Sequence, residues 1–112
     1  MDKLHRVRKN EEFQTIIKDR KSVANAKFVV YYKKNELSLL RVGVSVSKKL
    51  GKAVIRNKVK RQVRMMAREL FDQNQSMDYI IIVRNKFLED TYQGNKEDLL
   101  FLYNKINRRM DK

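Results

Sequence analysis

A run of cations without a single acid is the strongest chemical signal in this sequence. Nine basic residues and no Asp or Glu occupy positions 48–68: Lys48, Lys49, Lys52, Arg56, Lys58, Lys60, Arg61, Arg64 and Arg68. Four of these are spaced four residues apart and would share one flank of a helix, with Asn57 and Arg61 beside it: Arg56, Lys60, Arg64 and Arg68. Like charges at this spacing destabilise an isolated helix by about 0.2–0.5 kcal/mol per pair, so an ordinary solvated face would include glutamates. Because the arginine fork can hold two phosphate oxygens or stack on a base, the row is typical of a phosphate-binding surface.

Two further features could contact a nucleic acid. Gly51 can adopt backbone angles closed to other residues, and the helix that follows it would offer free N–H groups to a phosphate. Tyr31 and Tyr32 would point to opposite faces of a strand, so one of them can face outward and stack on an unpaired base. A structural interpretation is favoured for Phe13, Phe28 and Tyr32, which are better explained as core residues than as a stacking surface.

Catalytic groups are hard to find in the chain. His5 is the only histidine and lies in a basic N-terminal segment, and there is no cysteine. The acids are scattered and show no spacing that suggests a two-metal site: Glu11, Glu12, Asp19, Asp72, Asp78 and Glu89. We therefore predict no catalytic residue and no metal ligand in the protein, which disfavours a self-sufficient nuclease.

Charge and length narrow the class of protein. The 112 residues fit one domain, with residues 1–9 as a basic and mobile N-terminal arm. The formal net charge is 27 − 13 = +14, which works against a compact state unless a polyanion neutralises it. An anionic membrane surface is the main rival to a nucleic acid, but the longest apolar run, residues 79–83, is too short to cross a bilayer. We expect a soluble cytoplasmic protein with no membrane partner and no evident obligate protein partner.

The apolar pattern predicts the elements that must position the basic row. Asn10 is a fair N-cap for a short helix that ends near Asp19, with Phe13, Ile16 and Ile17 on its apolar face. Residues 27–33 and 41–47 are typical of paired strands, the second with Val42, Val44 and Val46 facing a core. Over residues 53–71 the period becomes helical, with a predicted buried stripe of Ile55, Val59, Val63, Met66 and Leu70.

The rest of the chain predicts a helix-on-sheet sandwich. Residues 79–83 are apolar on both faces, which indicates a central strand, and the helix before them implies a crossover between parallel strands. Gly94 and Asn95 precede a last amphipathic helix with five inward residues: Leu99, Leu100, Leu102, Tyr103 and Ile106. With a short strand near Val23, the predicted class is α+β in the order αβββαβα, a central mixed sheet packed by helices.

The central motif resembles a known family. Residues 44–64, VSVSKKLGKAVIRNKVKRQVR, resemble the signature of the bacterial ribonuclease P protein subunit. That family has an Arg-Asn-Arg-type helix, and Arg56 and Asn57 match its first two residues. Flanking segments at residues 9–13, 22–25, 28–31 and 78–84 agree, so the resemblance covers about residues 4–106. Ile17 lies where relatives often carry an aromatic residue.

The resemblance implies a role, partners and an unusual topology. In that family a large RNA holds the catalytic Mg²⁺ ions and cuts precursor tRNA to form the mature 5′ end, so the protein itself would bind no cofactor. It would be the accessory subunit of an endoribonuclease, with ribonuclease P RNA and precursor tRNA as partners. The family also implies a left-handed β-α-β crossover.

Site residues follow from the same resemblance. Those expected to bind the RNA subunit are Lys48, Lys49, Lys52, Arg56, Asn57, Lys60, Arg61, Arg64 and Arg68. Those expected in a cleft for the single-stranded 5′ leader of precursor tRNA are Phe13, Ile17, Phe28, Tyr31 and Arg84. The alternative is a ribosomal-type or general RNA-binding protein, which would bind many RNAs and would not distinguish precursor from mature tRNA.

Overall fold

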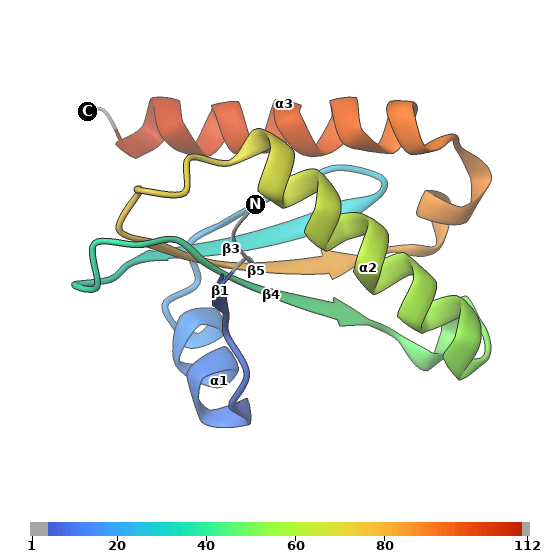
Figure 1. Ribbon diagram of the computed structural model, residues 1–112, viewed down its shortest axis with the longest axis horizontal. Coiled ribbons are helices and arrows are strands. Elements are labelled where there is room, and N and C mark those ends of the chain that lie inside the picture. Colours follow the sequence, from blue (N-terminus) through green and yellow to red (C-terminus); the bar gives the residue numbers. More distant parts are fainter. Residues whose placement is uncertain (1–4, 111–112) are drawn as a thin grey trace.

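Helices cover both faces of a five-stranded mixed sheet in the computed structural model, which describes residues 5–110 (Figure 1). The helices and strands are β1 (His5–Arg6), α1 (Asn10–Lys18), β2 (Ser22–Ala24), β3 (Phe28–Lys34), β4 (Arg41–Val46), α2 (Ala53–Leu70), β5 (Met77–Val83) and α3 (Tyr92–Met110). Two short 3₁₀ helices, η1 (Lys48–Leu50) and η2 (Asn85–Glu89), follow β4 and β5. The predicted α+β class is confirmed.

The sheet places the central strand as the apolar pattern predicts. The strand order is β1-β4-β5-β3-β2, with β5 in the middle and six of its seven residues buried. β4 pairs in parallel with β5, and α2 makes the crossover between them. β3 runs antiparallel to both β5 and β2. The left hand of this crossover stays a prediction from the resemblance.

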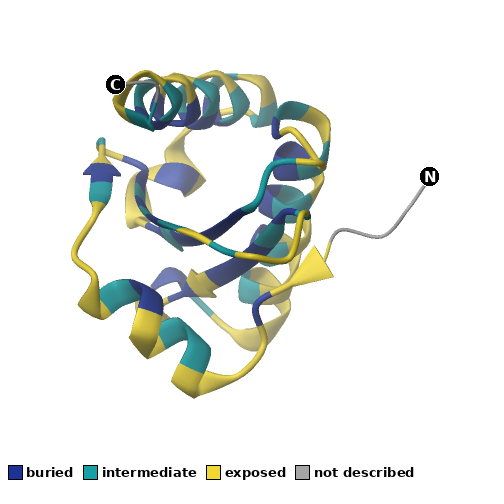
Figure 2. Ribbon diagram, turned by 90° about the vertical axis from the view of Figure 1, so that its left-hand side faces the viewer, coloured by how far each residue is buried: buried dark blue, intermediate teal, exposed yellow. Residues whose placement is uncertain are grey.

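The main core lies between the sheet and the pair of helices α2 and α3. Val42, Val44 and Val46 of β4 face it, as predicted, together with α2 and α3 residues that are almost fully buried: Val59, Val63, Met66, Leu99, Leu102, Tyr103 and Ile106. Burial of apolar area on this scale is the main stabilising term of the fold. Figure 2 shows that the buried residues gather on the surfaces where sheet and helices meet.

A second, smaller cluster lies on the opposite face of the sheet under α1. Val7, Ile16 and Ile80 are buried there, and Phe13 and Tyr31 are partly buried against them. A nine-residue helix is marginal in isolation, so these contacts and its ion pairs must hold α1 in place. Because α1 covers only part of this face, the sheet remains accessible beside it.

Three expectations need correction. Residues 5–9 are not wholly a mobile arm, because His5 and Arg6 pair with β4 and Val7 is 3% exposed; residues 1–4 lie outside the described part. Ile55 is 41% exposed rather than buried, because the first turns of α2 lie beyond the end of β4 (Figure 1). The last helix begins at Tyr92, so Asn95 lies inside it, where its Nδ2 donates to the Phe87 carbonyl oxygen at 3.0 Å.

Candidate nucleic-acid interface

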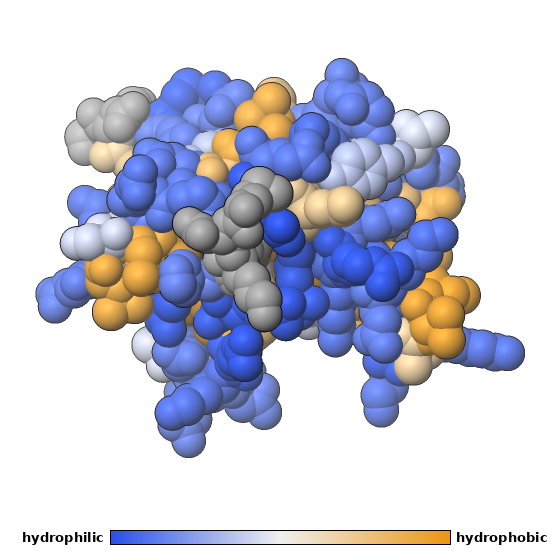
Figure 3. Space-filling view, viewed as in Figure 1, coloured by the Kyte–Doolittle hydropathy of each residue, from blue (hydrophilic) through white to orange (hydrophobic). Residues whose placement is uncertain are grey.

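The basic row of α2 runs along the border between the buried stripe and solvent. Arg56, Lys60, Arg64 and Arg68 are all partly buried, while Asn57 and Arg61 are exposed. The predicted flank is therefore confirmed as a surface of the helix. Hydrophilic side chains cover most of the face of the molecule in Figure 3, the face on which α2 lies.

The segment before α2 is shaped by its capping residues. Ser47 Oγ accepts a hydrogen bond from the Lys49 backbone N–H at 3.2 Å and caps η1. Gly51 has φ of 146°, a region that side-chain-bearing residues rarely adopt. Its carbonyl oxygen accepts from Arg56 Nε at 3.2 Å, which fixes that side chain near the start of α2. Lys48, Lys49 and Lys52 are exposed around this turn.

The far end of the row faces β1 and forms a cationic cavity. This cavity has a volume of about 890 Å³ and is lined by His5, Arg6, Arg8, Leu37, Leu39, Arg41, Arg64 and Arg68. The Nε atoms of Arg64 and Arg68 are buried without a hydrogen-bond partner. Burial, followed by the charges of Arg6 and Arg8, lowers the pKa of Arg64. Among residues 5–110, no carboxylate lines this cavity, so its guanidinium groups are suited to a bound phosphate.

The cleft that the resemblance implies falls on the α1 face of the sheet. Phe13 and Ile17 of α1 and Tyr31 of β3 are each partly buried, and Phe13 and Tyr31 pack against the same small cluster under α1. Tyr31 and Tyr32 do point to opposite faces, and Tyr32 is buried in the main core. An aromatic surface that is partly open to solvent can stack on an unpaired base.

Gly43, which sequence reasoning did not single out, lies in close contact with Phe13 on this face of the sheet. A Cβ atom at this position would lie 2.6 Å from Phe13 Cζ and 2.9 Å from Ile80 Cδ1. Real Cβ atoms do not approach carbon so closely, so only glycine lets the Phe13 ring rest against β4. The sequence signal was the lone glycine in a run of alternating valines.

Arg84 lies at the end of β5, at the rim of a second hollow. That hollow has a volume of about 440 Å³ and includes Ser47, Lys49 and Ile82 in its lining. Arg84 is exposed, and its Nη1 donates to the Asn25 carbonyl oxygen at 2.8 Å. Ile82, which also packs against the α1 cluster, connects this hollow with the cleft.

The placement of Phe28 in the cleft is wrong. Its side chain is fully buried, in the core on the α3 side of the sheet, where it packs edge-on against Phe87 with ring centroids 5.8 Å apart. Residues two apart on a strand share a face, so Phe28 lies with Val30 and Tyr32 and not with Tyr31. It is a core residue that cannot touch a ligand on the α1 face.

A partly buried ion network joins α1 to the sheet. Arg41 Nε and Nη2 donate to the two carboxylate oxygens of Asp78 at 2.9 and 2.7 Å, and Arg41 Nη1 donates to Glu12 Oε2 at 2.6 Å. These bonds raise the pKa of Arg41 above its usual value, and the hydrogen bond from Arg41 lowers the pKa of Glu12. Asp78 lies within β5 and is only 5% exposed, so its carboxylate depends on Arg41 for compensation.

Within residues 5–110, no three His, Cys, Asp or Glu side chains are grouped so that they could hold a metal ion. None of the helices over that same range is long and apolar enough to cross a membrane.

Comparison with known proteins decides the family. The family described as Ribonuclease P matches residues 1–107. The chain belongs to the ribonuclease P protein family. The ribonuclease P protein component of Bacillus cereus (strain AH187) is 46% identical over 105 residues, which cover 92% of this chain and 91% of that protein.

Solved structures of ribonuclease P proteins share the fold. The Staphylococcus aureus protein has a TM-score of 0.83 and 39% identity, with 93% of this chain and 96% of that chain covered. The Thermotoga maritima protein has a TM-score of 0.77 and 34% identity, with 88% and 94% covered. Membership of this family confirms the prediction of an accessory protein subunit of an endoribonuclease, and it implies an RNA partner.

Proposed function

We propose that α2 and β1 of this ribonuclease P protein bind the phosphate backbone of ribonuclease P RNA, and that the α1 cleft binds the single-stranded 5′ leader of precursor tRNA. The two surfaces lie on different sides of the sheet, so one molecule can hold both RNAs at once. The protein thereby assists removal of the leader, while hydrolysis belongs to Mg²⁺ ions held by the RNA.

The main support for RNA binding by α2 and β1 is the cationic cavity between them. Arg64 and Arg68 of α2 line it, and Arg6 and Arg8 add charge from the neighbouring segment. A phosphate in this cavity would accept hydrogen bonds from the guanidinium groups and would offset the repulsion between them. The exposed members of the row, such as Arg61, extend this surface along α2.

The leader site rests on chemistry of a different kind. Phe13 and Tyr31 offer partly open aromatic surface on the α1 face, and Arg84 supplies a cation at the end of β5. Unpaired bases stack on aromatic rings with little regard to sequence. Because mature tRNA has no leader, contacts in this cleft favour precursor over product.

Reconstitution with the cognate RNA tests the proposal. Added to its host's ribonuclease P RNA at low Mg²⁺ concentration, the protein should raise cleavage of precursor tRNA and bind precursor more tightly than mature tRNA. Absence of both effects would refute it. Equal affinity for many unrelated RNAs would instead support a general RNA-binding protein.

Two variants separate the surfaces. Arg61→Ala should weaken assembly with ribonuclease P RNA and reduce the salt dependence of binding by about one unit, because it removes about one phosphate contact. Tyr31→Ala should leave assembly intact but weaken binding of leader-bearing tRNA by about 1–3 kcal/mol if the ring stacks on a base. An equal loss for mature tRNA would show that Tyr31 acts through the fold alone.

A further inference from the structure

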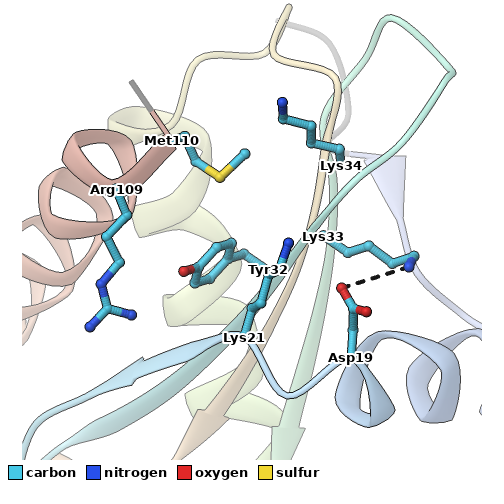
Figure 4. Close-up of a pocket in the computed structure, with 7 residues that line it drawn as sticks. All are labelled: Asp19, Lys21, Tyr32, Lys33, Lys34, Arg109 and Met110. Carbon is cyan, nitrogen blue, oxygen red and sulfur yellow. Dashed lines mark ion pairs between the residues drawn. The ribbon is translucent and has the colours of Figure 1, made fainter. Parts of the chain in front are cut away.

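A basic pocket at the end of β3 belongs to neither surface described above (Figure 4). It lies between the turn after α1, the end of β3 and the C-terminal end of α3, and its volume is about 310 Å³. Four cations, one carboxylate and a tyrosine line it: Lys21, Lys33, Lys34, Arg109, Asp19 and Tyr32. Three separate elements therefore bring positive charge to one small space.

Most of this charge is not neutralised by other residues in the described range 5–110. Lys33 is turned toward Asp19, with Nζ 3.7 Å from Oδ2 (Figure 4). Among the ion pairs formed by residues 5–110, none includes Lys21, Lys34 or Arg109. A bound anion would relieve the mutual repulsion among these three cations.

Two polar groups at the pocket are already positioned. Arg109 Nη1 donates to the Ser22 carbonyl oxygen at 3.0 Å, which holds the guanidinium at the rim and leaves its other N–H groups available. The Tyr32 ring is almost fully buried, and its hydroxyl is directed toward Arg109 (Figure 4). The pocket therefore offers a guanidinium group, ammonium groups and a hydroxyl group, all of which can donate hydrogen bonds to phosphate oxygens.

Protection of a strand edge explains only part of this cluster. β2 and the Lys21 carbonyl oxygen pair with β3 as far as Tyr32, so Lys33 and Lys34 lie on an unpaired edge, where lysines deter association between sheets. Lys21 and Arg109 come from a turn and from a helix, and edge protection does not require either of them.

We propose that this pocket binds phosphate groups of an RNA backbone, as a contact beyond the α1 cleft. Lys33 follows Tyr31 by two residues on the same face of β3, so it lies about 7 Å farther along the strand. An RNA strand that leaves the cleft past Tyr31 reaches Lys33 and then Lys21, Lys34 and Arg109. The inference rests on the proposed function, and the RNA is either the distal part of the leader or ribonuclease P RNA.

The test compares two matched double variants in the reconstituted holoenzyme. Lys21→Gln with Arg109→Gln removes two cations of the pocket. Arg20→Gln with Arg108→Gln removes the same charge from the preceding position in each element, where both side chains are exposed and neither lines the pocket. Each protein is assayed with mature tRNA and with precursors whose leaders have about 4 and about 15 nucleotides, the range of single-strand sites.

Loss of two phosphate contacts should reduce the slope of log affinity against log salt concentration by about 1.4 for the long-leader precursor. Near 0.1 M salt this change corresponds to about a 25-fold loss of affinity. Affinity for the short-leader precursor should not change, which also shows that the variant is folded, and the control pair should behave like wild type. Asp19→Asn should instead raise the affinity for the long-leader precursor by about 5-fold, because it frees Lys33 from its ion pair.

The remaining outcomes show which RNA supplies the phosphate, and they distinguish failure of the pocket from failure of the proposed function. A loss confined to assembly with ribonuclease P RNA supports the pocket and assigns the phosphate to that RNA. No difference between the pocket variant and the control in either assay overturns the pocket. If wild type itself does not prefer precursor over mature tRNA, the leader part of the proposed function fails, and assembly with ribonuclease P RNA alone decides for or against the pocket.

Discussion

Adding one methyl group at Gly43 should disturb the leader cleft without touching the α2 surface. In Gly43→Ala the new Cβ would lie 2.6 Å from Phe13 Cζ and 2.9 Å from Ile80 Cδ1, so one of these side chains must move. Ile80 is fully buried, whereas Phe13 is partly open on a surface helix, so the ring of Phe13 should move outward.

The expected energies follow from this geometry. Overpacking costs about 1–3 kcal/mol, and a ring that is free to move places the cost near the lower end. The change from glycine restricts the unfolded chain and offsets about 0.4–1 kcal/mol of that cost. The free energy of unfolding should therefore fall by at most about 1 kcal/mol. Loss of one stacked base would weaken leader binding by about 5- to 150-fold, which corresponds to about 1–3 kcal/mol.

Equilibrium binding of precursor and mature tRNA by the reconstituted holoenzyme measures this effect. Ser45→Ala is the matched control, because Ser45 lies two residues farther along the same face of β4 and the change adds no atom. Assembly with ribonuclease P RNA should equal that of wild type for both variants. Wild-type affinity of Gly43→Ala for precursor tRNA would refute the reasoning that the Phe13 position sets leader binding.

Three further outcomes are expected. Arg64→Ala should weaken assembly with ribonuclease P RNA and lower the salt slope by roughly 0.7–0.9, measured by titration at several salt concentrations. Phe28→Ala should lower the free energy of unfolding in urea by about 3–5 kcal/mol, because it empties a fully buried site; a selective loss of leader affinity without lost stability would contradict its core position. Glu12 has a lowered pKa through its hydrogen bond with Arg41, so its stabilising contribution is present above the ordinary value of 4.5 and is lost as pH falls through the lower folded value. Wild type should therefore lose stability relative to Glu12→Gln in that acidic range, and parallel pH profiles would argue against the pair.

Local patterns in the sequence were enough to predict most elements. Alternation at Val42, Val44 and Val46 identified β4, and the helical period that includes Val59 and Val63 identified α2. These signals work because side-chain direction follows the period of the element itself. Ile55 obeyed the same period and was still mispredicted, since its burial depends on how far the sheet extends beneath the helix.

Features that depend on contacts distant in sequence were missed. Arg41 and Asp78 are register partners on neighbouring strands, and Phe13 meets Gly43 only when α1 folds onto the sheet. The strand β1 was missed because its two residues are His and Arg, which carry no β signal of their own. The basic row was found from sequence because its members are neighbours on a single helix.

The short segment Arg6–Arg8 belongs to both surfaces of the protein. Val7 is buried with Ile16 and Ile80 beneath α1, and the arginines on either side of it line the cavity at Arg64. Because the three residues share one backbone, an anion that holds the arginines in place also holds Val7 in the wall of the cleft. Thermodynamic linkage gives any coupling between the two surfaces the same size in both directions.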